Sequence, residues 1–312
     1  MEKIKILITG GAGNVGGALA RRLVEDDKYF VVIADNLSTG SREKLPSVEY
    51  KNWSFVFCDV NNHRDISEVM LAYKFDYVFH YAALVGVKRT QDNPIMVLND
   101  IDGIKNVLNL CKNTSVKRAF FSSSSEVYGE PVELPQHEHT TPLNSRVPYA
   151  VVKNVGESFF RSFKKSYDLD FTIFRFFNTY GPNQSKDFVV AKFISLALKN
   201  EDITIYGDGS QTRTFCFVDD NVETCVRIFE KGLEINDVIN IGGAEEITIL
   251  ELAKLVIRIT NSSSKIIHLD PLAEGDMTRR MPDNAKMKNI IGKPLISIED
   301  GILRMIESGV FQ

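Results

Sequence analysis

Short apolar runs alternate with amphipathic stretches through the first half of the chain. The runs are too continuous for strands with one wet face and fit strands buried on both faces of a parallel sheet. The stretches between them repeat with helical periodicity. This alternation predicts an α/β fold with a doubly wound parallel sheet of the Rossmann type. The expected strands are Lys3–Thr9, Phe30–Ala34, Ser54–Cys58, Phe75–His80, Lys117–Ser122 and Phe171–Phe177.

A glycine-rich turn follows the first expected strand and precedes a helix that runs to about Glu25. Three of its glycines have the spacing of a dinucleotide fingerprint. Glycines there let the backbone turn tightly and approach a pyrophosphate at the helix N-terminus. The turn therefore predicts a dinucleotide cofactor, and its expected contacts are Gly10, Gly13, Asn14, Val15 and Gly16.

Acidic and small residues follow the next strands. Asp35 ends the second strand, where a carboxylate binds an adenosine ribose and repels a 2′-phosphate, so NAD is favoured over NADP. Asp59 ends the third strand and either reaches the adenine or lies in water. Small residues after the fourth strand would leave room for the cofactor. The further candidate cofactor contacts are Asn36, Val60, Ala82, Ala83 and Asn99.

Two polar residues in otherwise apolar elements have open interpretations. His80 ends an apolar strand, where a hydrogen-bonded core histidine is a better explanation than a ligand. Asn99 lies in the long amphipathic helix expected at Pro94–Lys112. It either braces the catalytic loop or is simply exposed.

The elements become shorter after Phe176, which predicts a smaller second lobe. We expect an NAD-binding Rossmann domain over residues 1–175, to which a segment of about 214–241 returns. Residues 176–213 and 242–312 would form the substrate-binding lobe, with the substrate in the cleft between the lobes.

Hydroxyl side chains and a Tyr–Lys pair are concentrated between Ser122 and Lys153. Tyr149 and Lys153 are four residues apart, so they lie on one face of a helix that Pro148 begins. An ammonium beside a phenol favours the phenolate, so the pKa of Tyr149 should fall and make it a base for a sugar or alcohol hydroxyl. Ser124 would share the hydrogen bond to the same oxygen. A Tyr and a Lys at this spacing also occur often by chance on a protein surface. Whether this pair is functional therefore depends on the other motifs in the chain.

Composition excludes several classes of protein. The formal net charge of −4 over 312 residues argues against non-specific binding to nucleic acids or anionic membranes. We find no signal peptide and no apolar run of membrane length, so we expect a cytoplasmic protein. The four cysteines have neither metal nor redox spacing, which predicts buried free thiols and no metal site. Phosphate would have to be bound by local arginines and helix N-termini.

With these pieces placed, the sequence resembles the extended short-chain dehydrogenase/reductases that act on nucleotide sugars. The resemblance covers nearly the whole chain. Beyond the glycine turn, it is carried by Asp35-Asn36, Ala82-Ala83, Ser124-Ser125-Glu126-Val127-Tyr128-Gly129, Tyr149–Lys153, Arg175-Phe176-Phe177-Asn178 and Tyr206–Arg213. It implies NAD as cofactor, a nucleotide-sugar substrate with UDP-sugars favoured, and a homodimer formed through the helices at Pro94–Lys112 and Tyr149–Tyr167.

The resemblance also implies roles for individual residues. Tyr149 would remove the proton of the sugar 4-hydroxyl as a hydride passes to nicotinamide, Lys153 would hold the nicotinamide ribose, and Ser124 would orient the oxygen. Arg213 resembles the arginine that clamps the diphosphate, although a structural ion pair is the alternative. One of two adjacent arginines would bind phosphate as well, and the sequence leaves open which. The implied substrate contacts are Ser124, Ser125, Asn178, Arg213, Arg279 and Arg280.

Three fates of the resulting 4-keto sugar define three enzymes. We rank a UDP-sugar 4-epimerase first, because it needs nothing beyond the serine, tyrosine and lysine, and because His80–Pro94 looks most like that group. A UDP-glucuronate decarboxylase comes second. Ser125–Gly129 and Arg279-Arg280 resemble it, whereas Ala150-Val151-Val152 and Asn183 depart from its usual pattern.

An NDP-sugar 4,6-dehydratase ranks third. Glu126 is the decisive residue, because in a dehydratase it would take the C5 proton, whereas in a plain epimerase it would have no task. It could instead point away and cap a turn. A non-catalytic NAD-sensing relative is less favoured, since such proteins usually lack the tyrosine or the lysine. A classical alcohol or steroid dehydrogenase would have no use for the loop Gly207–Arg213.

Overall fold

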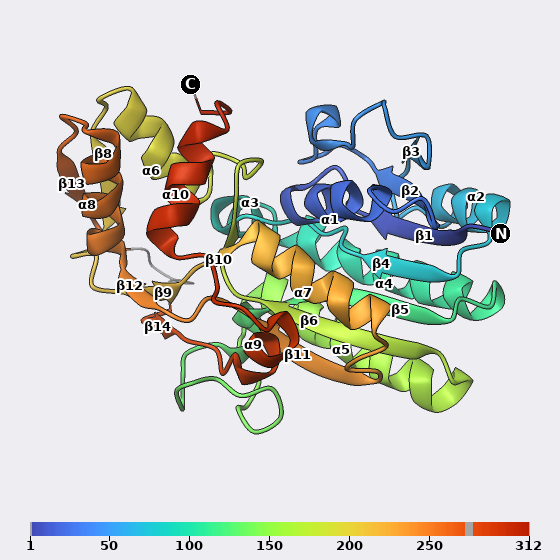
Figure 1. The fold of residues 1–312 in the computed structure, drawn as a ribbon. Coiled ribbons are helices and arrows are strands. Elements are labelled where there is room, and N and C mark those ends of the chain that lie inside the picture. The colour runs from blue at the N-terminus through green and yellow to red at the C-terminus, as the bar shows by residue number, and fades with distance from the viewer. Residues whose placement is uncertain (1, 272–276, 312) are drawn as a thin grey trace.

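The computed structural model describes residues 2–271 and 277–311 and confirms the doubly wound α/β fold (Figure 1). Seven parallel strands form one sheet in the order β11-β6-β5-β4-β1-β2-β3. The strand order reverses between β1 and β4, and ligands of open α/β sheets bind at such a reversal, beyond the carboxyl ends of the strands. The strands are β1 Ile4–Thr9, β2 Tyr29–Asp35, β3 Trp53–Phe57, β4 Tyr77–His80, β5 Arg118–Ser124, β6 Asp170–Phe176 and β11 Asp237–Ile241.

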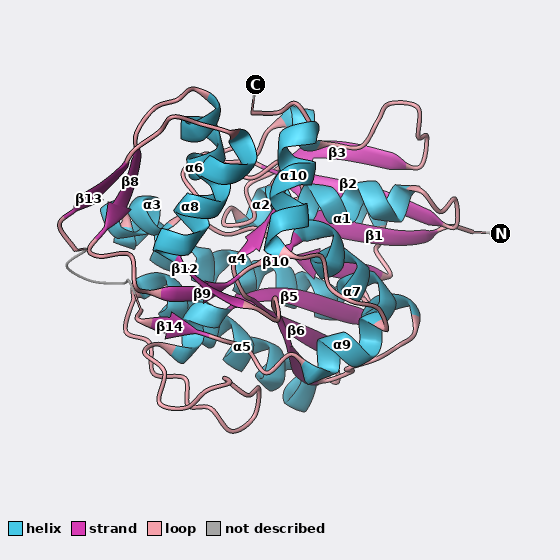
Figure 2. Cartoon of the chain, turned by 60° about the vertical axis from the view of Figure 1, so that its left-hand side comes forward, coloured by secondary structure: helices cyan, strands magenta, loops and turns pink. Residues whose placement is uncertain are grey.

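Helices cover both faces of this sheet (Figure 2). On one face α1 (Asn14–Val24) packs against α7 (Val218–Glu230), with α9 (Ala285–Ile291) beside α7. On the other face α4 (Pro94–Asn113) lies between α2 (His63–Tyr73) and α5 (Pro148–Tyr167). Each face has its own buried apolar cluster, as expected for strands that are apolar on both sides.

Most of the remaining elements gather beyond the carboxyl edge of the sheet. They form a second unit, which we call the small lobe. Its strands form two small sheets, β8 with β13 and β12 with β9 and β14, and its helices α6, α8 and α10 contact one another. The bounds are α6 Val189–Leu198, β8 Ile203–Tyr206, β9 Thr212–Thr214, β12 Glu246–Thr248, α8 Ile249–Thr260, β13 Ile266–Leu269, β14 Arg279–Arg280 and α10 Ile298–Glu307. The boundaries that we gave to the two lobes stay a prediction.

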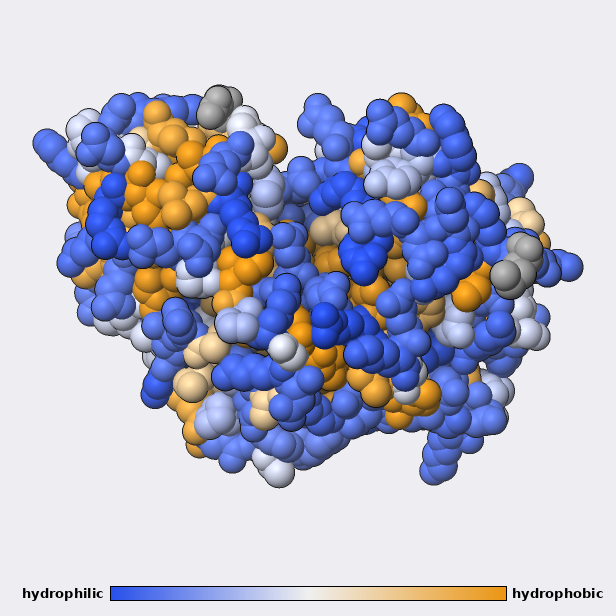
Figure 3. Space-filling model, in the orientation of Figure 1, coloured by the Kyte–Doolittle hydropathy of each residue, from blue (hydrophilic) through white to orange (hydrophobic). Residues whose placement is uncertain are grey.

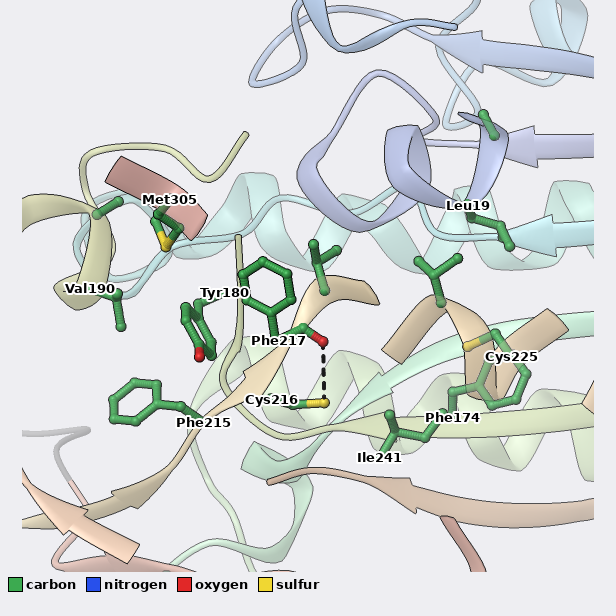
Figure 4. Close-up of a cluster of buried hydrophobic side chains, with 14 of the residues drawn as sticks. Leu19, Phe174, Tyr180, Val190, Phe215, Cys216, Phe217, Cys225, Ile241 and Met305 are labelled. Atoms are coloured by element: carbon green, nitrogen blue, oxygen red, sulfur yellow. Dashed lines mark hydrogen bonds between the residues drawn. The ribbon is translucent and has the colours of Figure 1, made fainter. Parts of the chain in front are cut away.

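Short elements connect the sheet to the small lobe or border the site. They are η1 Arg42–Lys44, α3 Val87–Asp92, η2 Ser125–Tyr128, β7 Thr179–Tyr180 and β10 Cys216–Phe217. Aromatic contacts fill the junction that β7 and β10 form (Figure 4). Tyr180 meets Phe217 edge-on at 5.3 Å between ring centroids and Phe215 at 6.1 Å. Such contacts fix the small lobe against the sheet, so the two can share one rigid site.

The four cysteines are buried and free, as predicted. Within residues 2–271 and 277–311, no three His, Cys, Asp or Glu side chains are grouped so that they could hold a metal ion.

Across the same described ranges, every helix is too short or too polar to cross a bilayer.

Candidate active site

A cavity of about 1310 Å³ opens at the carboxyl ends of the central strands. The glycine turn, the ends of β2, β4 and β5, the start of α5 and parts of the small lobe line it. In the space-filling view a notch separates the small lobe from the sheet (Figure 3). All the site residues predicted from the sequence line this cavity, with the exception of Arg279. The structure thus brings together side chains that are more than 250 positions apart in the chain.

The glycine turn forms a cradle that excludes side chains. Gly10 has a φ of +67°, and a Cβ on it would lie 2.6 Å from the backbone nitrogen of Ala82. A Cβ on Gly16 would lie 2.4 Å from the carbonyl oxygen of Gly10. The backbone at the N-terminus of α1 is therefore open to a ligand, and its N–H groups suit a pyrophosphate. The cradle fits the dinucleotide that the sequence predicts.

Asp35 is fixed at the edge of the same cradle. Its carboxylate accepts hydrogen bonds from the backbone N–H groups of Ala12 at 3.0 Å and Leu37 at 2.7 Å. The carboxylate is thus held rigidly at the end of β2, where a ribose would arrive. Asp59 lines the cavity at the end of the next strand, and its Oδ1 accepts a hydrogen bond from the Asn61 N–H at 2.9 Å.

His80 is a buried, neutral core histidine, which confirms the preferred interpretation. The Thr9 hydroxyl oxygen accepts hydrogen bonds from the N–H groups of Tyr81 at 3.2 Å and Ala82 at 3.3 Å. Its proton is therefore free to be donated to His80 Nδ1, which lies 2.8 Å away. Burial, aided by the charge of Lys153, lowers the pKa of His80 to about 3. This interaction fixes the start of the loop that packs against Gly10.

Lys153 is anchored to β5. Its Nζ donates to the Ser122 carbonyl oxygen at 2.6 Å and approaches the Ser122 hydroxyl at 3.4 Å. It lies 5.7 Å from the centroid of the Tyr149 ring. Burial lowers the pKa of Lys153 to about 8, and the charge of Asp100 opposes this shift.

The expected fall in the pKa of Tyr149 is wrong for this structure. Burial raises the pKa of the phenol well above its ordinary value, and the carboxylate of Glu126 raises it further. A hydrogen bond with Ser124 and the charge of Arg280 act in the opposite direction. The sequence argument considered only the neighbouring ammonium and omitted the loss of water and the facing carboxylate. Tyr149 is therefore a neutral phenol in this structure.

Asp100 is a site residue that the sequence analysis missed. Its carboxylate accepts hydrogen bonds from the Leu84 N–H at 2.7 Å and from the Asn61 side-chain amide at 3.2 Å. Asp100 thus braces the loop after β4. Asn99, which we had considered as a brace for the catalytic loop, lines the cavity at an exposed position. A signal was available, because Asp100 falls on the buried stripe of α4 between Val97 and Ile104.

Glu126 and Arg280 form a pair inside the cavity. The Ser124 hydroxyl accepts a hydrogen bond from the Glu126 N–H at 3.1 Å, which fixes the turn η2. The Glu126 carboxylate lies 3.5 Å from the Arg280 guanidinium, and the Arg280 side chain is only 7% exposed. Arg279 turns outward and binds Glu246, with 2.7 Å between Nε and Oε1. The two arginines diverge because adjacent residues of a strand point to opposite sides.

The small lobe and the connection between β6 and β7 add further polar groups to the cavity. Arg213 and Asn178 line it; the Arg213 guanidinium donates to the Thr212 carbonyl oxygen at 2.7 Å, and the Asn178 amide donates to the Thr214 carbonyl oxygen at 2.9 Å. Lys192 of α6, which the sequence analysis did not single out, also lines the cavity. These cations suit the diphosphate of a nucleotide sugar.

A known protein family and its curated relatives match this chain over most of its length. The model of the NAD dependent epimerase/dehydratase family matches residues 6–242. UDP-glucuronic acid decarboxylase 3 of Arabidopsis thaliana is 35% identical over 97% of this chain and 88% of its own length.

Solved structures agree with this match. UDP-glucose 4-epimerase of Thermotoga maritima, determined with UDP-glucose, is 31% identical and superposes with a TM-score of 0.90 over 97% of this chain and 98% of its own. UDP-glucose 4-epimerase of Thermus thermophilus, determined with NAD, is 26% identical, with a TM-score of 0.90 over 98% of this chain and 99% of its own. These relatives are named for different reactions, a decarboxylation and a 4-epimerisation, and the family model that matches this chain is NAD dependent. The chain belongs to the NAD dependent epimerase/dehydratase family.

Proposed function

We propose that this protein oxidises C4 of a UDP-sugar and that its substrate carries a C6 carboxylate, which makes it a UDP-glucuronate decarboxylase. The observation that carries this proposal is the Glu126–Arg280 pair, which lies in the same cavity as Ser124, Tyr149 and Lys153. A plain 4-epimerase has no use for such a pair. The structure therefore changes the order in which we rank the reactions.

The first step uses the groups around Tyr149. Tyr149, once ionised, takes the proton of the sugar 4-hydroxyl, and Ser124 shares the hydrogen bond to the same oxygen. Lys153 contributes positive charge and holds the cofactor ribose. NAD held at the cradle of Gly10 and Gly16 would supply the acceptor for the C4 hydride, and because the hydride is returned it would not be consumed.

The second step uses the opposite side of the sugar. The C6 carboxylate is then β to the C4 ketone, so the C5–C6 bond breaks, carbon dioxide leaves and its electron pair is delocalised onto the ketone oxygen. Arg280 has five N–H donors, and its contact with Glu126 leaves others for the carboxylate. A proton from solvent would then add at C5, on the side that Glu126 faces. The hydride would return to C4 as Tyr149 gives its proton back to the C4 oxygen.

A 4-epimerase is the second candidate. It needs only Ser124, Tyr149 and Lys153 to oxidise C4 and to reduce the ketone from its other face. Ala150-Val151-Val152 and Asn183 support it, because they depart from the usual decarboxylase pattern.

Mass spectrometry and NMR of the products distinguish these reactions. The protein is incubated with NAD and UDP-glucuronate, UDP-glucose, dTDP-glucose or GDP-mannose in turn. We expect UDP-glucuronate to lose the mass of carbon dioxide. Loss of water would select a dehydratase, and an unchanged mass with altered ring couplings would select an epimerase.

Tyr149→Phe is the matched control. It should bind NAD normally and convert none of the four sugars. If the unaltered protein converted none of them either, C4 oxidation would be wrong for these substrates.

We also propose that the protein is a homodimer through α4 and α5. These helices lie side by side on one face of the sheet and expose large apolar side chains. The exposed residues are Ile95, Met96, Leu98, Val151 and Tyr167, of which Ile95 is 70% exposed. A second copy would cover them. Sedimentation measurements on the unaltered protein and on Met96→Asp test this homodimer. A monomeric unaltered protein would contradict the proposal.

A further inference from the structure

A buried ion pair joins Glu157 of α5 to Arg175 of β6. Arg175 Nε donates to one carboxylate oxygen at 2.8 Å, and a terminal guanidinium nitrogen donates to the other at 2.7 Å. Both side chains are only 2% exposed. Removing two charges from water is costly, so such a pair is a poor device for stability alone. Its contacts indicate what else it does.

Glu157 connects α5 to β5 next to the reactive groups. It accepts a hydrogen bond from the Ser123 hydroxyl at 2.7 Å. Lys153, one helical turn earlier, donates to the Ser122 carbonyl oxygen at 2.6 Å. Two consecutive residues of β5 therefore hold two successive turns of α5. The next residue of β5 is Ser124 and the preceding turn of α5 carries Tyr149, so these attachments set how the two groups face each other.

Arg175 also reaches the turn that carries Glu126. A terminal nitrogen donates to the Tyr128 hydroxyl at 2.8 Å. Tyr128 ends η2 and in turn donates to the Asn240 side chain at 2.7 Å. The position of the Glu126 backbone is thereby linked to β6 and β11.

The same guanidinium nitrogen is also connected, through hydrogen bonds, to the segment that carries Arg280. It donates to the Glu138 carbonyl oxygen at 2.9 Å. Two residues earlier, the Gln136 N–H donates to the carbonyl oxygen of Met281 at 2.7 Å. Met281 directly follows Arg280 in the chain. One buried guanidinium is therefore connected to every segment that carries a reactive side chain.

We infer that Arg175 is a positioning residue that holds two halves of the active site in register. One half, with Ser124, Tyr149 and Lys153, acts at C4, and the other, with Glu126 and Arg280, faces C5. The inference rests on the proposed oxidation at C4 and is independent of the fate of the ketone. Catalysis is sensitive to such register, because a displacement of about 1 Å can cost roughly a hundredfold in rate.

Three substitutions test this role. Arg175→Lys keeps a charge beside Glu157 but cannot form the two-pronged contact. Because it leaves Glu157 and Tyr128 poorly paired, it could prevent folding, so two milder variants accompany it. Ser123→Ala removes the hydroxyl between β5 and Glu157, and Tyr128→Phe removes the hydroxyl between Arg175 and η2.

Tyr29→Phe is the matched control. Tyr29 is also buried and its hydroxyl donates to a carboxylate, that of Glu230, at 2.8 Å. It lies at the amino end of β2, on the edge of the sheet away from the cavity. Tyr29→Phe should lose about as much thermal stability as Ser123→Ala and Tyr128→Phe, without affecting the register of the site.

We expect Ser123→Ala and Tyr128→Phe each to lower kcat by about tenfold or more, with little change in KM or in NAD affinity. Tyr29→Phe should keep kcat within about twofold while losing a similar amount in Tm. The measurement uses whichever UDP-sugar the unaltered protein converts, so a wrong fate for the ketone does not disturb it. If both variants behaved like Tyr29→Phe, the inference would be overturned.

Crystal structures of the variants give a readout that needs no turnover. We expect the separation of the Ser124 and Tyr149 oxygens to change in Ser123→Ala, and Glu126 to move relative to Arg280 in Tyr128→Phe. Unchanged positions of these four side chains in both variants would overturn the inference even if the proposed reaction were also wrong.

Discussion

The carboxylate of Glu126 lies 3.5 Å from the guanidinium of Arg280, although 154 positions separate the two residues in the chain. Both residues line the cavity, and Tyr149 lies close enough to them for both charges to affect the pKa of its phenol, in opposite directions. In the proposed reaction, the pair would set the charge that a sugar meets next to its C5.

Arg280 and Arg279 should differ sharply in their effect on activity. Arg280→Gln removes the cation beside Glu126 and should lower kcat/KM for UDP-glucuronate by roughly a hundredfold, as the loss of a buried charged contact does. Arg279→Gln removes only a surface pair with Glu246 and should change it by less than about threefold. Steady-state kinetics of both variants measures the difference. Equal losses would contradict the assignment of Arg280 to the sugar.

Asp35 should determine the choice of cofactor. Asp35→Asn removes the charge that repels a 2′-phosphate and weakens the acceptor for the ribose, so affinity for NADP should rise and affinity for NAD should fall. We expect the NAD/NADP ratio of dissociation constants to change by about tenfold or more. Titration calorimetry measures both affinities, with Asp27→Asn as an exposed control. Equal affinity of the unaltered protein for both cofactors would refute the role of Asp35.

Asp100→Asn should move the pH–rate profile to lower pH. Asp100 raises the pKa of Lys153, which burial lowers to about 8, and it also raises the pKa of Tyr149. The other groups near the pair are unaltered in this variant: His80 is neutral beside Lys153, and Glu126 and Arg280 still face Tyr149. The variant therefore removes only the charge of Asp100. Without it the phenol ionises at lower pH and the ammonium is lost at lower pH.

The matched control for this variant is Asp102→Asn. Asp102 lies on the exposed side of the same helix, where it pairs with Lys105 at 3.2 Å. Its profile should match that of the unaltered protein. A profile of Asp100→Asn that kept both limbs in place would show that Asp100 acts on the loop at Leu84 and not through its charge.

His80 should make the fold sensitive to acid. Its pKa is about 3 in the folded chain and about 6.5 in the unfolded chain, so the unfolded state binds the extra proton and stability falls as pH drops below about 6.5. This one group should account for roughly 2 kcal/mol of the free energy of unfolding lost between about pH 7 and pH 5.

Urea denaturation at the two pH values measures this loss. His80→Asn offers Thr9 an acceptor that does not titrate in this range and should reduce the loss by about that amount. His63→Gln changes an exposed histidine and should leave it unaltered. An equal pH dependence in all three proteins would disprove the contribution of His80.

The sequence alone predicted the sheet, its helices and a set of residues that, apart from Arg279, all line the cavity. Strand and helix periods are local properties, and the glycine turn at Gly10 and the acid at Asp35 follow from their positions next to predicted strands. The Tyr149–Lys153 pair likewise follows from helical spacing. Where these residues lie relative to one another depends on the carboxyl edge of a parallel sheet, which the alternation of elements already implies.

Only the tertiary structure decided the electrostatics of the site. Whether Arg279 or Arg280 faces the cavity depends on the side of β14 that packs against it, and the role of Asp100 depends on a loop from another part of the chain. The pKa of Tyr149 rises because its phenol is buried and because the carboxylate of Glu126, which belongs to another element, faces it. Local sequence fixes spacing along one element, whereas burial and the charges that face a side chain come from segments far apart in the chain.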